Sequence, residues 1–177
     1  MTPTAPRTAA LALAAACLVA CSPTLDWRES RPEGSGATLM FPCRPGKLER
    51  TVHLAGATLT MQQHACSAGG VLYSLSVAQA AAPESVSPLL AAWRADAASN
   101  IGGVASELPP PVVSGATPNP NSGFVRLAGK LPDGRPVVEH AAFFVRGTRL
   151  YQAAVVTTTK RVGPEALDNF FGAIRLQ

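Results

Sequence analysis

Charged and aromatic side chains are scarce in this sequence. Charged residues make up 15% of its 177 residues and aromatic residues 6%, against 47% hydrophobic residues. A chain this apolar can bury a core, which excludes intrinsic disorder. Its four cysteines are too few for a small domain held together mainly by disulfides. The formal net charge of +4 is mild and the basic residues are dispersed, so the composition argues against nucleic-acid binding.

Signatures of catalysis and of metal binding are missing too. The chain has no G-x-S-x-G, nucleotide P-loop or H-E-x-x-H motif. Glu139 and His140 are neighbours in an expected strand, so their side chains point to opposite faces and cannot act as a pair. His64 and Cys66 would share a strand face, but a metal site needs more ligands than this pair. We therefore expect a protein that is not an enzyme and holds no cofactor or metal.

Residues 1–20 have the features of a secretory signal peptide. Arg7 is the only charged residue among the first 25, and a short apolar stretch runs from Thr8 to Ala20. That stretch has 13 residues, whereas a transmembrane helix needs about 20. A basic residue, a short apolar stretch and small residues before the cleavage site are typical of secretion.

The end of this stretch, LVAC at positions 18–21, resembles the lipobox of bacterial lipoproteins. The resemblance implies that Cys21 becomes the first residue of the mature chain and carries acyl chains on its sulfur and its amine. Two or more chains anchor a protein stably to a membrane. Ser22 follows, which in enterobacterial lipoproteins implies the periplasmic face of the outer membrane. The alternatives are acylation at Cys17, which lacks a branched residue three positions earlier, or an unacylated signal or short anchor with an incidental cysteine.

The mature chain divides into a tether and one domain. Residues 21–36 are polar and contain several prolines and glycines, so they predict an acylated cysteine followed by a tether. Trp27 is unusual in such a segment. It either packs back onto the domain or contacts a partner, because tryptophan is common at the centres of interfaces. Residues 37–177 form the expected domain.

Short apolar segments between turn signals predict strands over most of this domain. Their ranges are 37–42, 47–54, 57–65, 71–79, 124–130, 137–145, 149–158 and a terminal 173–176. Ser87 as N-cap and Pro88 in the first turn predict a long helix that ends before Gly102. A short helix is expected over 165–171. This order predicts an α+β fold, with an antiparallel sheet of about six strands, one long helix and one short helix.

The layout resembles that of the Mog1/PsbP-like domains. Those domains begin with an apolar strand that ends in a Phe-Pro pair, here Phe41-Pro42, and close with a short helix and a strand, here FFGAIRL. The resemblance covers about residues 37–176 and implies an accessory role. The stretches LDWRE, FPCRP and GATPNP are also similar to those of small uncharacterised proteobacterial lipoproteins, a similarity that implies no activity.

Cys43 and Cys66 are the two cysteines that follow the predicted tether, and each lies just beyond an expected strand end. Because the periplasm is oxidising, this pair predicts a structural disulfide. The loop that it closes spans 23 residues, for which chain entropy predicts a stabilisation of roughly 3 kcal/mol. The spacing is not C-x-x-C, so a redox-active pair is not expected.

Together these features predict a lipid-anchored cell-envelope lipoprotein. We expect a non-enzymatic accessory or protein-interaction module, whose partners are the membrane, through Cys21, and an unknown envelope protein. The predicted contact residues are Trp27 and the loop 108–123, with Pro118, Asn119 and Pro120 in its centre.

A periplasmic small-ligand-binding domain is the alternative. Its pocket would lie between the long helix and the sheet, because such pockets are concave and mostly apolar. The candidate lining residues are Trp93, Phe143, Phe144 and Tyr151, which are equally good candidates for an ordinary core. The basic residues near the turns form either a solvated rim or a patch that faces anionic lipids or an acidic partner.

Overall fold

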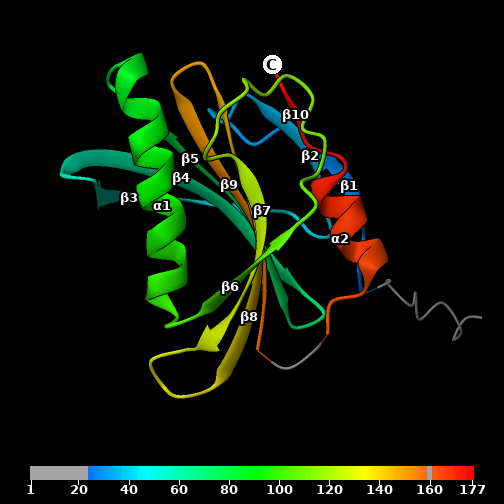
Figure 1. The fold of residues 1–177 in the computed structure, drawn as a ribbon. Helices are drawn as coiled ribbons and strands as arrows, with labels where there is room; N and C mark the ends of the chain where they lie inside the picture. The colour runs from blue at the N-terminus through cyan, green and yellow to red at the C-terminus, as the bar shows by residue number, and fades with distance from the viewer. Residues whose placement is uncertain (1–23, 159–160) are drawn as a thin grey trace, which may run out of the picture.

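The computed structural model describes residues 24–158 and 161–177, so the predicted signal peptide, Cys17 and the predicted acylation site Cys21 lie outside the described residues. The described chain forms a mixed α/β domain, mostly sheet, with ten strands in two antiparallel sheets and two α-helices (Figure 1). The prediction of about six strands is therefore wrong in number, although the α+β class with antiparallel sheets is confirmed.

The larger sheet has seven strands in the order β3-β4-β5-β9-β8-β7-β6, and every neighbouring pair is antiparallel. Ala55 and Gly56 join the first hairpin with φ angles of 46° and 79°, and two positive φ values suit a two-residue type I′ turn. The strands are β3 (Gly46–Leu54), β4 (Ala57–Ala68), β5 (Val71–Gln79), β6 (Val104–Leu108), β7 (Gly123–Lys130), β8 (Pro136–Arg146) and β9 (Arg149–Thr157).

A smaller sheet joins segments from both ends of the domain. Its order is β1-β2-β10, with β1 (Arg28–Ser30), β2 (Ala37–Phe41) and β10 (Arg175–Leu176). This sheet and helix α2 (Pro164–Phe171) lie on one side of the larger sheet, and helix α1 (Val86–Asn100) covers the other side (Figure 1). Residues 28–30, which lie within the predicted tether, pair with β2 as a strand of this sheet.

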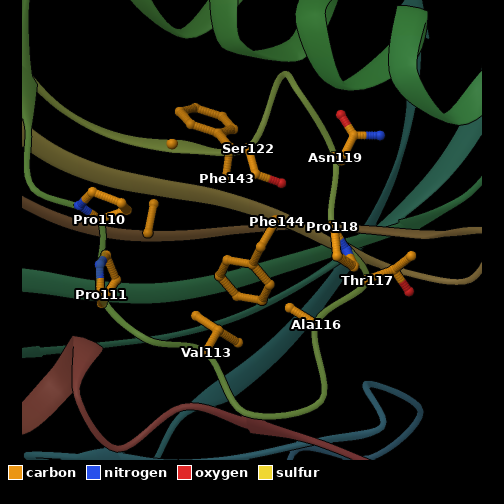
Figure 2. A pocket seen from close by; sticks show the side chains of 12 residues that line it. Pro110, Pro111, Val113, Ala116, Thr117, Pro118, Asn119, Ser122, Phe143 and Phe144 are labelled. Atoms are coloured by element: carbon orange, nitrogen blue, oxygen red, sulfur yellow. The ribbon is translucent and has the colours of Figure 1, made fainter.

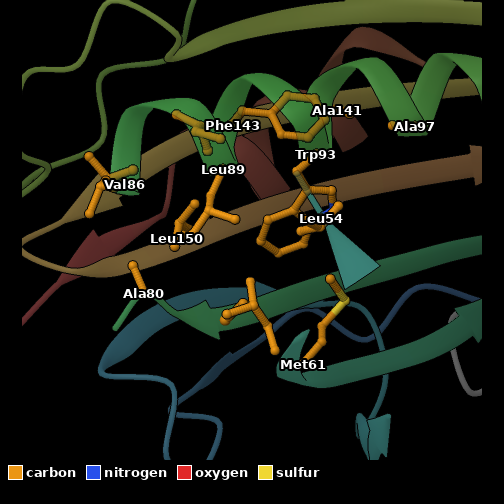
Figure 3. Close-up of a cluster of buried hydrophobic side chains, with 14 of the residues drawn as sticks. Leu54, Met61, Ala80, Val86, Leu89, Trp93, Ala97, Ala141, Phe143 and Leu150 are labelled. Atoms are coloured by element: carbon orange, nitrogen blue, oxygen red, sulfur yellow. The ribbon is translucent and has the colours of Figure 1, made fainter. Parts of the chain in front are cut away.

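Two hydrophobic cores lie on the two faces of the larger sheet. On β8, Phe143 and Val145 belong to the core under α1 (Figure 3), whereas Ala142 and Phe144 belong to the core under α2. Successive side chains of a strand alternate between faces. A strand that is apolar on both sides therefore requires cover on both sides, which α1 and α2 provide.

Helix α1 begins earlier than predicted. Ser85, not Ser87, precedes the helix, and it makes no side-chain cap hydrogen bond. Pro83 opens a short 3₁₀ helix, η1 (Pro83–Ser85), that runs directly into α1. The backbone is already helical when it reaches Ser87, so the Ser87 hydroxyl is available for a tertiary contact instead.

Candidate functional site

Residues 109–122 connect β6 to β7 and form an ordered loop, here named the proline loop. The Thr117 amide donates to the Val145 carbonyl at 2.8 Å, which attaches the loop to the end of β8. The Leu176 amide donates to the Ser114 carbonyl at 2.8 Å, which attaches it to β10. The predicted loop therefore has a fixed conformation on the surface of the domain.

A third attachment joins the proline loop to the start of α1. The Asn121 side-chain amide donates to the carbonyl and hydroxyl oxygens of Ser87 at 3.0 and 2.9 Å. The Asn119 Oδ1 atom accepts a hydrogen bond from the Asn121 backbone amide at 2.9 Å. Asn119, which the sequence predicts as a contact residue, is thus partly occupied in shaping the loop.

Between the proline loop and β8 lies a pocket of about 320 Å³, named the loop pocket (Figure 2). This volume is at the lower end of the range for small-molecule sites, about 300–1,000 Å³. The pocket therefore fits a group about as large as one bulky side chain. Most of its walls are apolar, formed by Pro110, Pro111, Val113, Ala116 and Pro118 of the loop and by Ala142, Phe143 and Phe144 of β8.

One polar atom in the loop pocket has no partner. The hydroxyl oxygen of Ser122 is buried, and no other described residue forms a hydrogen bond with it. Leaving a buried hydroxyl unpaired costs about 1–3 kcal/mol. This oxygen has almost no solvent-accessible surface, so a group in the pocket does not reach it without a local rearrangement. Thr117 and Asn119 are the other polar side chains that line the pocket.

The predicted contact residues lie in different environments in the structure. Pro118 lines the loop pocket and is exposed, and Pro120 is exposed beside it. Trp27 is half-buried and packs edge-to-face on Tyr73, with ring centroids 5.6 Å apart. Trp27 therefore packs back onto the domain, and we do not include it in the site. Val112, which the sequence analysis did not single out, is 90% exposed on the proline loop.

The ligand pocket expected between the long helix and the sheet exists only in a smaller form. Phe143 and Phe144 line the loop pocket instead, and Tyr151 is fully buried in the core. A hollow of about 180 Å³ lies under the second half of α1, and of the four predicted lining residues only Trp93 borders it. Leu89, Trp93 and Phe143 belong to the core that packs under the helix (Figure 3).

Glu139 borders this hollow and is the most perturbed acid in the described chain. It accepts a hydrogen bond from the Gln152 side-chain amide at 2.9 Å, and burial raises the pKa of its carboxyl group to about 7. His140 faces the opposite side of β8, next to Phe124, where burial lowers its pKa. The two side chains are on opposite faces, as predicted, so they do not form an acid–base pair.

The other histidines are far from one another. Lys47 lies opposite His64, and His53 follows Lys47 by six positions along β3, which corresponds to about 20 Å. His64 is buried, and burial is the main cause that lowers its pKa. Cys66, near His64, forms a disulfide with Cys43 across a Cα–Cα distance of 6.0 Å. The described residues contain no cluster of three or more metal-ligating side chains.

A second pocket, of about 490 Å³, adjoins the loop pocket through Thr117. Arg146 and Arg149 line it, and we name it the arginine pocket. The sequence analysis included both arginines only among the dispersed basic residues. A two-residue turn at 147–148 makes them cross-strand partners, and this spacing was the signal that could have identified them.

Comparison of the chain with protein-family models, with curated proteins and with solved structures finds no match. Neither α1 nor α2, the two α-helices of the described chain, combines the length and hydrophobicity that a membrane span requires. The argument for function therefore depends on the sequence motifs and on the geometry of the site.

Proposed function

We propose that this protein is a lipid-anchored lipoprotein of the cell envelope, held on the periplasmic face of the outer membrane by acyl chains on Cys21. Its domain is a non-enzymatic interaction module that binds another envelope protein through the loop pocket. The layout, which resembles that of Mog1/PsbP-like domains, is consistent with such an accessory role.

The observation that carries this proposal is the loop pocket itself. An ordered loop with three attachments encloses apolar walls, and exposed Val112, Pro118 and Pro120 surround them. Apolar surface that a protein leaves open next to a fixed loop is typical of interaction sites. No acid–base pair or metal cluster accompanies it in the described residues, which favours binding over catalysis.

The direction of the site relative to the anchor supports the same proposal. Thr24, three residues after Cys21, lies against Gly69 at the β4–β5 turn. The loop pocket is at the other end of the strands, where Thr117 pairs with Val145. Along β9, the positions opposite Val71 and Gln79 are eight residues apart, or about 27 Å. A chain anchored at Cys21 therefore presents the loop pocket away from the membrane.

Photo-crosslinking in intact cells tests this function. A benzophenone amino acid at position 112, which is 90% exposed, should form an adduct with a specific envelope protein. The matched control is position 104, where Val104 is also apolar and 75% exposed but lies on β6. The Ala116→Phe variant, with the same probe at 112, fills the pocket and should lose the adduct. Identical adducts from 112 and 104, or none from 112, would contradict the proposal.

A small, mostly apolar ligand is the second candidate, and the apolar walls of the loop pocket favour it. Native mass spectrometry distinguishes the two. A small molecule retained by the wild-type protein and absent from Ala116→Phe, without any protein adduct from position 112, would support the ligand-binding function.

A further inference from the structure

Two arginines face each other at the turn between β8 and β9. Arg146 and Arg149 are directly paired across the two strands, on either side of Gly147 and Thr148. Like charges in directly opposite positions destabilise an antiparallel pair. This placement is unfavourable for the isolated domain, so it raises the question of what neutralises the two charges.

Neither arginine has an acidic partner among the described residues. The five ion pairs of the described chain all involve other residues. Arg146 donates from Nη1 to the Gly115 carbonyl at 2.8 Å, and the Arg149 guanidinium lies near the Tyr151 hydroxyl. Both side chains are thus positioned by neutral oxygen atoms, which leaves their charges available to a bound anion.

The rest of the arginine pocket is suited to an oxyanion. Its other side chains include Gln79, Thr117 and Thr148, which are neutral hydrogen-bonding groups. Gln177, the last residue of the sequence, also lines it, and neither arginine forms an ion pair with it. Guanidinium groups bind carboxylates through paired hydrogen bonds. Thr117 borders both pockets, so an anion here would lie next to an apolar group in the loop pocket.

We infer that the two pockets form one composite site for a segment of a partner protein in which an apolar side chain lies next to a carboxylate. This inference depends on the proposed function and specifies its partner. The apolar side chain enters the loop pocket and packs against its proline and phenylalanine walls. The carboxylate of an aspartate or a glutamate binds between Arg146 and Arg149.

An acidic protein segment fits this site better than an anionic lipid. The turn between β8 and β9 is at the opposite end of β9 from Thr24, through which the chain leads back to the anchor. The arginines therefore do not face the membrane that holds Cys21. In addition, exposed Pro110 and Pro118 leave the loop pocket open on one side, whereas sites for small apolar ligands enclose most of the ligand.

Selection from a phage-displayed library of random dodecapeptides tests the inference. The bait is the full-length protein in vesicles of phosphatidylcholine, a lipid with no net charge. Peptides with an apolar residue adjacent to aspartate or glutamate should be enriched at least tenfold. The double variant Arg146→Gln/Arg149→Gln should lose the acidic preference. The matched control, Lys130→Gln/Arg135→Gln, removes the same charge at the exposed β7–β8 turn and should keep it.

Three outcomes would overturn the inference in distinguishable ways. If peptides are enriched for apolar residues alone and Ala116→Phe abolishes this, the composite site is refuted while the proposed function stands. If Ala116→Phe does not change the enrichment, both the composite site and the proposed function are refuted. If no acidic peptide is enriched but vesicles with phosphatidylglycerol bind the protein through Arg146 and Arg149, the anion is a lipid headgroup. Near-ultraviolet circular dichroism confirms that each variant is folded.

Discussion

Glu139 is a largely buried acid, and its burial makes the ionised carboxylate unfavourable. Its backbone lies in the first half of β8, and its side chain borders the hollow under α1 with one hydrogen bond from Gln152. No described residue forms an ion pair with it. Burial without a cation favours the neutral carboxylic acid, which is why the pKa rises to about 7.

The Glu139→Gln variant should therefore be more stable than the wild type above pH 7. The folded protein holds a proton that the unfolded chain releases near its ordinary pKa of 4.5. Wild-type stability is thus fully present below that pH and falls as the pH rises to about 7, by up to about 3 kcal/mol. Urea unfolding at pH 4 and pH 8 measures this, with equal stabilities expected at pH 4.

Glu49→Gln is the matched control for this measurement. Glu49 also accepts a glutamine hydrogen bond, from Gln62 at 2.9 Å, but it is exposed. Glu49 also forms an exposed ion pair with Lys47, and such pairs contribute little to stability, so its replacement should change the free energy of unfolding by less than about 1 kcal/mol at either pH. If the difference in stability between Glu139→Gln and the wild type is the same at pH 4 and at pH 8, the role of burial is refuted.

At the scale of elements, helix α1 can pack closely against β7 because Gly129 has no side chain. A Cβ atom on Gly129 would overlap the carbonyl oxygen of Ile101 and lie 3.0 Å from the Gly103 Cα atom. The Lys130 amide donates to the same Ile101 carbonyl at 2.9 Å. The end of α1 therefore approaches β7 more closely than any residue except glycine allows.

We expect Gly129→Ala to lower the free energy of unfolding by about 1–3 kcal/mol, the usual cost of overpacking. Gly46→Ala is the control, because a Cβ there would meet only the Ala65 carbonyl oxygen at an ordinary 3.9 Å. Urea unfolding of the two variants measures the difference. Equal stabilities would show that α1 moves away from β7 without cost.

The elements that sequence patterns predicted best are those with strong local signals. The strand expected over 71–79 is β5, because its alternation and flanking turns are clear, and the short helix expected over 165–171 is α2 with one more residue. By contrast, the first four residues of β6 are exposed and its sequence, VASEL, has no alternation. Its pairing with β7 decides that it is a strand, and such a pairing is not visible in a five-residue segment.

At the scale of the whole molecule, the first and last strands of the described domain meet in the smaller sheet. β2 pairs with β1 on one side and with β10, near residue 177, on the other. The Tyr151 hydroxyl donates to the Ser35 carbonyl at 2.9 Å and joins this sheet to the larger one. Thr24, which lies against the β4–β5 turn, and the two pockets are therefore at opposite ends of the strands.

Cys21→Ala should release the protein from the membrane fraction. The reason is that a signal without its acylated cysteine leaves no chains to insert, and each buried methylene contributes about 0.8 kcal/mol to anchoring. Immunoblots of membrane and soluble fractions measure the distribution. The control is Cys17→Ala, which should remain with the membrane. Retention of Cys21→Ala together with release of Cys17→Ala would assign the anchor to the other cysteine.

The sequence alone was enough to predict the α+β class, most strand ranges and the pairing of Cys43 with Cys66, because alternation, turns and cysteine number are local or composition-based signals. It also predicted that the proline loop contains contact residues. Only the tertiary structure placed Phe143, Phe144 and Ser122 around one pocket and Arg146 beside it. Those positions depend on how the loop folds back onto β8, and contacts between distant segments are determined by packing, not by local pattern.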